Sequence, residues 1–417
     1  MTWWQDKETE DIMIGFFDVL KAADLLKDEV IRTPLVYSPT FSRMANAEVY
    51  LKLENLQMGG SFKVRGATYK LLSHPTEIQT GVVAASVGNH AQGVALAACS
   101  AGVPATIIMP VWASISKQEA TRAYGAEVRL QGSSLVESID IGRRMAQETD
   151  RIFIHPYDDE EIIAGQGTVG LEILEDLPNT DLIIVPVGGG GLIAGVALAA
   201  KAIRPEARVV GVQAASCPSA KKALELGRPV EIQAEEQGSI ADAIMVTQVG
   251  EAPFPLLQKL VDDIILVDDD QIASAVLRLL ERKRTLAEGA AAAPLTALVG
   301  GSLQIEEGSR IVLVVSGGNV DSLLLERIIA TGLRRDGRLM HLSLCLRDAP
   351  GSLARLLSLL AGQEANVVHI HHARNESGVA FSYTRVDLEL ETRGFEHIRE
   401  IERALEGAGY RYKKDQI

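Results

Sequence analysis

Short apolar runs and helical stretches alternate along most of this chain, and this alternation limits the folds open to it. Runs rich in β-branched residues occur at 49–53, 82–85, 105–109, 182–187, 209–212, 264–267 and 311–315. Amphipathic or alanine-rich stretches lie between them, for example at 91–100, 134–148, 193–202 and 272–283. Strands alternating with helices of this length predict an α/β fold with doubly wound parallel sheets. A chain of 417 residues has room for two such subdomains and a further domain.

A different pattern begins after residue 337. Residues 333–337 are mostly charged, as in a linker. Leucines alternate over 342–346 as in a half-buried strand, and the leucines of 353–360 keep the i, i+3, i+4, i+7 spacing of one helix face. Further elements are expected as strands at 367–371 and 379–388, a helix at 396–405 and a short strand near Tyr410. The resulting order, βαββαβ, is that of a ferredoxin-like domain.

Composition and charge exclude several classes of function. The formal net charge of −14 disfavours contact with phosphate backbones, so we expect no nucleic-acid partner. Residues 182–200 carry no charge over 19 positions, which is close to the length of a membrane span. Because Pro186 and four consecutive glycines interrupt this run, we expect a buried strand, a turn and a buried helix, and no membrane association.

The cysteines also constrain the class of protein. Cys99, Cys217 and Cys345 are far apart and form no CxxC pair. An odd number at such spacings argues against a disulfide framework or a structural zinc site. We therefore expect a cytoplasmic protein in which Cys99 and Cys217 are small core residues.

The first of three candidate ligand loops is a run of four glycines. Gly188–Gly191 follows the apolar run 182–187 and opens the helix expected at 193–202. Because glycines lack Cβ atoms, consecutive backbone N–H groups can turn toward one point. The start of a helix adds its positive end. A strand, a glycine run and a helix in this order predict a phosphate site, with a flexible turn as the alternative.

Two more loops follow strands in the same way, and ligands of open α/β sheets gather at the carboxyl ends of strands. Ser316–Asn319 offers a hydroxyl that can hydrogen-bond a ring nitrogen, although a serine there is as commonly a helix cap. Ser86–His90 offers backbone donors at a helix start, suited to a carboxylate or simply to a capped helix. Lys63 lies in segment 60–67, where apolar neighbours would keep an amine partly uncharged and able to form a Schiff base.

Four short motifs occur together in a fixed order. They read Ser-Phe-Lys-x-Arg-Gly-Ala from Ser61, Ser-x-Gly-Asn-His-Ala-Gln-Gly from Ser86, Gly-Gly-Gly-Gly-Leu from Gly188 and Ser-Gly-Gly-Asn from Ser316. As a set they closely resemble the threonine dehydratase (threonine ammonia-lyase) group of fold-type II pyridoxal-phosphate (PLP) enzymes. The likeness covers roughly residues 17–330. The tail resembles, more weakly, the ACT-type regulatory domain found on one subgroup.

The resemblance implies a role for each residue of these loops. Lys63 would hold PLP as a Schiff base and later take the Cα proton of the substrate, and Ser316 would face the pyridine nitrogen. Phe62 would pack against the PLP ring, and Asn89 would hydrogen-bond its 3-hydroxyl. The PLP phosphate would be held by Gly188, Gly189, Gly190, Gly191 and Leu192. The substrate carboxylate would be bound by Ser86, Gly88, Asn89 and His90.

The resemblance also implies a reaction, a domain plan and a regulator. The reaction is dehydration and deamination of L-threonine, and of L-serine, to 2-oxobutanoate or pyruvate and ammonia. The implied domains are a PLP-dependent domain at 1–332 that includes a small subdomain at roughly 52–155, a linker at 333–337 and an ACT-like domain at 338–417. An amino-acid effector, isoleucine or valine, would bind near Asp348, Gly351 and Asn366. Because such regulatory domains usually pair, we expect a homodimer or homotetramer.

Four positions depart from the family pattern. Gly59 stands where the group usually has Thr, Val87 where relatives are often smaller, and Ala243 where Gly is usual. These departures leave open a racemase of serine or another amino acid, or a dehydratase of another β-hydroxy amino acid. Gln213 stands where metal-dependent serine racemases carry an acidic ligand, so we expect no metal site. An inactive amino-acid sensor is a further alternative, against which the intact Lys63 argues.

Three other patterns could suggest ligand sites, but we interpret each of them as a feature of the fold. Gly165–Gly170 matches G-x-G-x-x-G, but it follows a helical segment, whereas the dinucleotide fingerprint needs a preceding strand. Asp268–Asp270 is typical of acidic residues that open a helix. His369 and His371 share a strand face, and without a third ligand nearby we expect them to serve packing or an interface.

Overall fold

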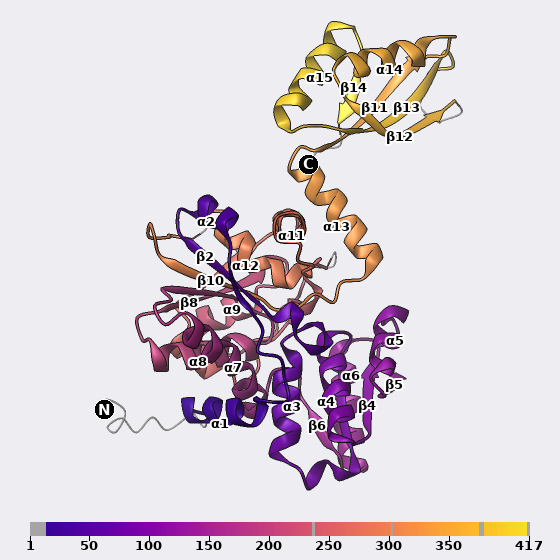
Figure 1. Cartoon of the computed structure of the whole chain (residues 1–417). Coiled ribbons are helices and arrows are strands. Elements are labelled where there is room, and N and C mark those ends of the chain that lie inside the picture. Colours follow the sequence, from indigo (N-terminus) through magenta and orange to yellow (C-terminus); the bar gives the residue numbers. More distant parts are fainter. Residues whose placement is uncertain (1–13, 236–237, 302, 375–378, 415–417) are drawn as a thin grey trace. The chain divides into compact units, whose positions relative to one another are not determined.

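The computed structural model describes residues 14–235, 238–301, 303–374 and 379–414, and it divides into two compact units. The first unit runs to Ser322 and the second starts at Leu323 (Figure 1). From the charges at 333–337 we expected a linker there, but helix α13 (Ser322–Arg335) continues through most of this segment. Arg334 and Arg335 form the last turn of α13, where positive charge favours the helix end.

The larger sheet of the first unit has six strands. They are β1 (Leu35–Tyr37), β2 (Glu48–Leu53), β7 (Leu182–Pro186), β8 (Arg208–Ala214), β9 (Asp263–Val267) and β10 (Arg310–Val315). Their order is β1-β2-β10-β7-β8-β9, and every pair is parallel except β1 with β2. All five residues of β7 are buried, as expected of a parallel strand covered by helices on both faces. This arrangement confirms the doubly wound sheet that the sequence predicts.

Helices cover this sheet and connect its strands. They are α1 (Phe16–Leu26), α2 (Pro39–Ala45), α7 (Glu160–Asp176), α8 (Gly191–Ile203), α9 (Ser219–Leu226), α10 (Phe254–Leu260), α11 (Asp269–Lys283) and α12 (Gly289–Val299). The uncharged run 182–200 forms β7, the glycine turn and most of α8, as predicted. Within the described residues, no helix has both the length and the apolar character needed to span a bilayer.

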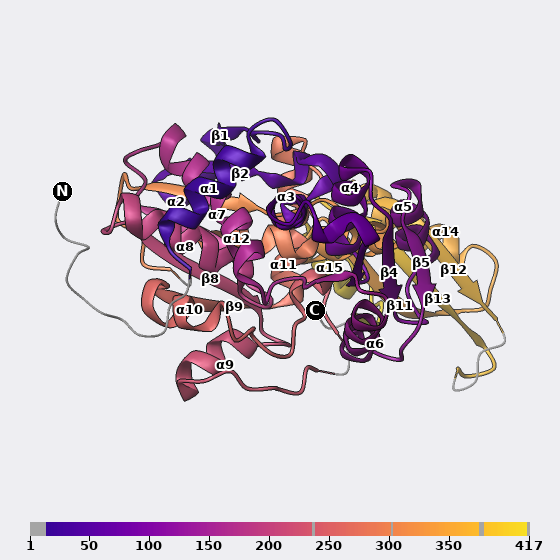
Figure 2. The ribbon, with the colours of Figure 1, turned by 90° about the horizontal axis from the view of Figure 1, so that it is seen from below.

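The smaller sheet of the first unit has four parallel strands. They are β3 (Val82–Ala85), β4 (Ala105–Met109), β5 (Glu127–Leu130) and β6 (Ile152–Ile154), in the order β5-β4-β3-β6. Helices α4 (Asn89–Ala101) and α6 (Leu135–Glu148) lie on opposite faces, and α5 (Ile115–Ala123) connects β4 to β5 (Figure 2). Val82 and Ala84 belong to the core that includes α4, whereas Val83 and Ala85 belong to the core that includes α6. This alternation explains why β3 is apolar on both faces.

Glycines bring three helices into close contact beneath the two sheets. Helix α3 (Lys63–Ser73) packs on α7, and α7 packs on α8. A Cβ atom added to Gly165 would lie 2.6 Å from Cα of Gly66, and one added to Gly195 would lie 2.4 Å from the Ile163 oxygen. The G-x-G-x-x-G match therefore lies inside α7, as the sequence predicts, and serves helix packing.

The second unit has the predicted order βαββαβ. Its elements are β11 (Leu339–Arg347), α14 (Ser352–Gly362), β12 (Asn366–Ala373), β13 (Tyr383–Glu391), α15 (Phe395–Gly407) and β14 (Tyr412–Lys414). The sheet is antiparallel in the order β12-β13-β11-β14. Leu342 and Leu344 of β11 pack with Leu356 and Leu360 of α14 in one core. Strand β13 begins later than the predicted residue 379, because a turn closes first with Tyr383 N–H donating to the Ala380 oxygen at 2.8 Å.

The cysteines divide between core and surface. Cys217 is buried, as predicted, whereas Cys99 is exposed near the end of α4, so its expected place in the core is wrong. The preceding Ala98 packs in the core of the smaller sheet, and residue 99 lies on the outer side of the helix. All three cysteines are free thiols.

Candidate active site

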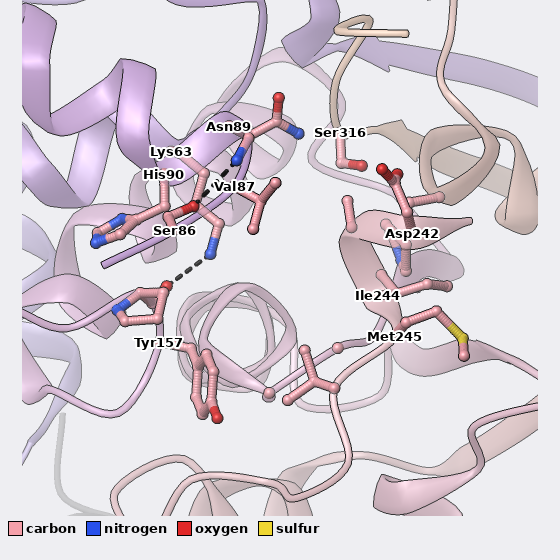
Figure 3. A pocket seen from close by; sticks show the side chains of 18 of the residues that line it. Lys63, Ser86, Val87, Asn89, His90, Tyr157, Asp242, Ile244, Met245 and Ser316 are labelled. Carbon is pink, nitrogen blue, oxygen red and sulfur yellow. Dashed lines mark hydrogen bonds between the residues drawn. The ribbon is translucent and has the colours of Figure 1, made fainter. Parts of the chain in front are cut away.

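One cavity of about 430 Å³ gathers the three predicted loops and Lys63. It lies in the first unit and draws its walls from both sheets and their connections. The predicted residues that line it are Phe62, Lys63, Ser86, Gly88, Asn89, His90, Gly188, Gly189, Gly190, Gly191, Leu192 and Ser316. Figure 3 shows Ser86, Asn89 and His90 on the same side as Lys63, with Ser316 and Asp242 opposite them.

Lys63 presents its amine inside this cavity. It is the first residue of α3, and its Nζ donates a hydrogen bond to the Pro156 oxygen at 2.6 Å (Figure 3). The Phe62 ring lies beside the amine, with its centroid 5.2 Å from Nζ. Burial lowers the pKa of Lys63 to about 8, while the nearby Glu288 opposes the shift. About a tenth of the amine is therefore uncharged at pH 7, far more than for a lysine of ordinary pKa.

The glycine loop, Gly188–Gly191, meets the lysine through the segment that follows β6. Gly190 has a φ of +100°, which favours glycine, and α8 begins at Gly191. A Cβ atom on Gly189 would lie 2.3 Å from the Tyr157 ring, so this loop passes directly under the ring. First-turn amides of a helix have no acceptor within the helix and suit an anion. Since Tyr157 follows Pro156, the same turn contacts both the lysine amine and the glycine loop.

Backbone hydrogen bonds join the Ser316 loop to the lysine segment. Phe62 N–H donates to the Ser316 oxygen at 3.1 Å, and Gly318 N–H donates to the Gly60 oxygen at 2.9 Å. An isolated bridge also pairs Ser61 with Gly317. The backbone of Ser316, at the carboxyl end of β10, is therefore tied to the segment that carries Lys63.

The third loop opens α4 with backbone donors and an uncharged imidazole. Gly88 N–H donates to Oγ of Ser86 at 3.2 Å, and α4 begins at Asn89. His90 Nε2 lies 2.9 Å from the Ile154 oxygen, so this nitrogen carries the proton and donates it. Burial, assisted by the charge of Lys63, lowers the pKa of His90 to about 3. His90 therefore remains neutral at every physiological pH.

The positions that depart from the family pattern do not all reach the cavity. Val87 and Ala243 line it, whereas Gly59 lies outside the lining, where its oxygen accepts a hydrogen bond from Asn319. Gln213 is buried, and its Oε1 accepts the backbone N–H groups of Ala220 and Lys221 at 3.0 Å. Gln213 thus serves the start of α9, and the described residues contain no group of three or more potential ligands placed to hold a metal ion.

Several residues of the cavity carry no role in the sequence-based interpretation. Glu288 is buried and accepts a hydrogen bond from Asn89, and Asn319 donates one to Asn89. At the rim, Lys117 of α5 forms an ion pair of 2.7 Å with Asp242. Asn319 lies within the motif that begins at Ser316, and Asp242 precedes Ala243, a position at which the chain departs from the family pattern. Nothing in the local sequence distinguishes Glu288 or Lys117 from surface charges.

Comparison with known protein families identifies the family of the chain that forms this cavity. A model described as pyridoxal-phosphate dependent enzyme matches residues 26–317. The chain belongs to this family of pyridoxal-phosphate dependent enzymes. Its cofactor is pyridoxal phosphate, and the lysine, the glycine loop and the neutral Ser316 lie together in one cavity of suitable chemistry.

Relatives of this PLP enzyme carry names of two activities. The chain is 44% identical to an L-threonine ammonia-lyase of Thermotoga maritima, over 95% of this chain and 98% of the relative. The crystal structure of a T.th. threonine deaminase aligns with a TM-score of 0.69 and 37% identity, covering 74% of this chain and 99% of that one. Maize serine racemase aligns with a TM-score of 0.71 and 34% identity, covering 77% and 98%.

The predicted effector residues lie at two ends of the sheet in the second unit. Asp348 follows the end of β11, where its carboxylate lies 3.4 Å from Nε of Arg374, and Gly351 begins α14 with a φ of +82°. Asn366 starts β12 and pairs with Glu391, which also pairs with Leu339 at the beginning of β11. One copy of the unit therefore does not bring Asn366 together with the 348–351 turn.

The acidic run at 268–270 and the two histidines of β12 lie outside the cavity. Asp268 is the N-cap of α11, where its Oδ1 accepts Gln271 N–H at 2.8 Å, as the sequence predicts. His369 and His371 both lie exposed on β12, at an edge of the four-stranded sheet.

Proposed function

We propose that this PLP enzyme dehydrates and deaminates L-threonine, and also L-serine, to 2-oxobutanoate or pyruvate and ammonia. The observation that carries the proposal is the shared cavity of Lys63, the glycine loop and Ser316. The names of the Thermotoga maritima relative and of the T.th. threonine deaminase support threonine as substrate.

The residues of the cavity offer a binding group for each part of the cofactor. The amides of the glycine loop and of the first turn of α8 would hold its phosphate, with Leu192 closing the loop. Lys63 would hold its aldehyde, Phe62 would pack against its ring and Asn89 would donate to its 3-oxygen. Pyridoxal phosphate, when bound, supplies the electron sink for the charge left at Cα.

The third loop would bind the substrate, and Lys63 would act as the base. Ser86, Gly88, Asn89 and His90 would bind the carboxylate at the start of α4, where the imidazole of His90 stays neutral. The amine of Lys63, once released, would take the proton from Cα, because burial lowers its pKa and makes the uncharged form accessible.

Ser316 would favour elimination over transamination. It is a neutral side chain at the carboxyl end of β10, where a carboxylate would keep the ring nitrogen protonated. A less electron-withdrawing ring limits the build-up of charge and favours prompt loss of the β-hydroxyl. The product would then tautomerise and hydrolyse to a 2-oxo acid and ammonia.

The proposal is tested by measuring 2-oxo acid formation from threonine, serine and other β-hydroxy amino acids. We expect a yellow protein with PLP and turnover of threonine, both lost in Lys63→Ala. A wild type that stays colourless with PLP, or that releases no 2-oxo acid from any of these substrates, would contradict the proposal. The same result would favour an inactive amino-acid sensor.

A racemase is the second candidate, because maize serine racemase has the same fold at 34% identity. Racemisation needs a proton donor in addition to the Lys63 base, and the Ser86 hydroxyl of the third loop lines the same cavity. Chiral analysis of remaining serine separates the two reactions, since a lyase leaves the substrate enantiomerically pure. A broader substrate panel also tests a dehydratase of a bulkier β-hydroxy amino acid.

We also propose that the second unit is an ACT-like domain that binds an amino-acid effector, isoleucine or valine, near Asp348, Gly351 and Asn366. Its βαββαβ order and the 95% coverage of this chain by the alignment with the Thermotoga maritima relative support this assignment. We further propose that the protein is a homodimer or homotetramer and that it lies in the cytoplasm. Its three free cysteines support a reducing compartment. Sedimentation with and without isoleucine measures the assembly.

A further inference from the structure

Glu288 has a side-chain position that helix stability does not explain. It is the N-cap residue of α12, yet its carboxylate makes no capping hydrogen bond. Short N-cap side chains such as those of Asp and Ser accept amides of the first helical turn, which the longer Glu288 side chain does not do here. Here Oε1 accepts Nδ2 of Asn89 at 2.7 Å, and the side chain, 4% exposed, lines the same cavity as Lys63.

The partners of Asn89 fix the orientation of its amide. Nδ2 of Asn319 donates both to the Gly59 oxygen at 2.8 Å and to Oδ1 of Asn89 at 2.7 Å. Since the Gly59 oxygen only accepts, the donor must be the Asn319 nitrogen, and Asn89 must present oxygen to it. The Asn89 nitrogen then faces Glu288, which has to accept. Of the two hydrogens on Nδ2, one goes to Glu288 and the other can reach a ligand in the cavity.

The Ser316 loop leaves no room for a side chain at residue 317 beside the Glu288–Asn89 hydrogen bond. A Cβ atom on Gly317 would lie 2.7 Å from Oε1 of Glu288 and 3.1 Å from Nδ2 of Asn89. Glu288 N–H also donates to the Gly317 oxygen at 3.1 Å. The Ser316 loop therefore packs directly on the Glu288–Asn89 pair, and Phe62 N–H joins the same loop to the lysine segment.

Burial favours the neutral form of Glu288 over its carboxylate. Burial raises the pKa of Glu288 to about 8, and the charge of Asp242 adds to this rise. Asn89, Lys117 and Lys63 act in the opposite direction without cancelling it. A carboxylate at this position would in turn raise the pKa of Lys63 and keep its amine protonated.

We propose that Glu288 is a positioning residue that acts as a neutral acid, holding Asn89 with one N–H directed at the cofactor ring while leaving the Lys63 amine without a fixed anionic neighbour. This inference rests on the proposed function, because it assumes that the cavity binds PLP through Lys63 and Asn89. It assigns a chemical state, and not only a contact, to a residue outside the recognised motifs.

The first test compares two substitutions by PLP affinity. The amide of Glu288→Gln offers the same acceptor without charge, so we expect the PLP dissociation constant and the pH dependence of loading to stay within about threefold of wild type. Glu288→Leu removes the acceptor, and we expect PLP binding to weaken about tenfold or more, with kcat falling more than KM changes. Absorbance titration of cofactor-free protein gives the affinity, and thermal melting reports folding.

A second measurement reads the protonation state directly. Infrared difference spectra at neutral pH should contain the carbonyl band of a protonated carboxylic acid that is present in wild type and absent from Glu288→Gln. Glu206→Gln, which changes an exposed glutamate, should leave this band in place. The band remains measurable in wild type even if a Glu288 variant fails to fold.

The outcomes separate this inference from the proposed function. A wild type that binds no PLP refutes the proposed function. A wild type that binds PLP and deaminates threonine, combined with a Glu288→Gln variant as impaired as Glu288→Leu, refutes only the neutral-acid role. Absence of the carboxylic-acid band in wild type refutes it as well.

Discussion

The Lys63 amine, which contacts the Pro156 oxygen, owes its lowered pKa to burial, since nothing in its own side chain differs from that of other lysines. A primary amine attacks an aldehyde only in its uncharged form. Because the pKa of Lys63 is lowered to about 8, the uncharged fraction rises with pH and is nearly complete about one pH unit above that value.

We therefore expect PLP loading of the cofactor-free protein to accelerate as pH rises and to level off near pH 9. An ordinary lysine would continue to gain reactivity up to about pH 10.4. Stopped-flow absorbance after mixing with PLP measures the rate, and Lys63→Ala is the control. A rate that still climbs steeply above pH 9 would mean that the amine is not desolvated as described.

Arg65, two residues after Lys63, is the centre of a buried ion network. Its guanidinium donates to Oε2 of Glu54 at 2.8 Å and to Oε1 of Glu172 at 2.6 Å, and Lys52 also pairs with Glu172. Burial alone would raise the pKa of Glu54, but the charge and hydrogen bonds of Arg65 outweigh it, and the net pKa is lowered. Glu54 thus contributes stability that is present above its unfolded pKa and is lost as the pH falls through its folded value.

We expect Arg65→Met to lower the free energy of unfolding by about 3–5 kcal/mol at neutral pH, because the buried Glu54 loses its ion-pair partner and Glu172 keeps only Lys52. The loss should shrink toward acidic pH, where the freed carboxylates can protonate. Urea unfolding at two pH values measures both effects. Arg122→Met, which removes an exposed pair with Glu119, should cost less than about 1 kcal/mol. Equal losses for the two variants would show that the network is not structurally important.

Among the elements, the glycine loop depends on its contact with the turn after β6. A methyl group on Gly189 would lie 2.3 Å from the Tyr157 ring, so the ring or the loop must move. We expect Gly189→Ala to weaken PLP binding by about tenfold or more, and Tyr157→Ala in that background to recover part of the loss. Gly407→Ala, where the added methyl meets nothing within 4 Å, is the matched control. Unchanged PLP affinity in Gly189→Ala would argue against a phosphate role for the loop.

Helix α5 and the segment around Asp242 meet at the cavity rim through a single ion pair. Lys117 and Asp242 are partly exposed, so their contact is weak and sensitive to salt. We expect Lys117→Ala to raise KM for the amino acid about two- to fivefold, with little change in kcat or melting temperature. High salt should produce the same shift in wild type but not in the variant. Glu119→Ala on the same helix is the control, and an equal rise in KM there would exclude a specific role for the pair.

The elements that the sequence predicts are those whose local pattern reflects their burial. Strand β7 is apolar throughout because helices cover both faces, and the spacing of its glycine loop is local to the chain. Strands β5 and β6 were missed because β5 is a largely exposed edge strand and β6 has only three residues. Glu288 was missed for another reason. It reaches Asn89 across 199 positions of sequence, and only tertiary packing brings it into the cavity.

At the scale of the whole molecule, the predicted effector residues of the second unit lie too far apart for one small effector to contact both groups within a single copy. Strand β11 has nine residues, which extend about 25–30 Å, and Asn366 is level with its beginning while Asp348 follows its end. An amino acid is far shorter than this distance. A site that uses both residues therefore needs two copies of the unit, each supplying one of them.

This geometry predicts complementation between variants. We expect Asp348→Ala and Asn366→Ala each to abolish the response of activity to isoleucine or valine while leaving basal turnover unchanged. Mixed oligomers, prepared by unfolding and refolding the two variants together, should recover part of the response, because some interfaces then pair an intact Asp348 with an intact Asn366. A response that neither substitution changes would refute the effector site. Loss of the response in each variant without recovery in the mixture would contradict a site that is shared between two copies.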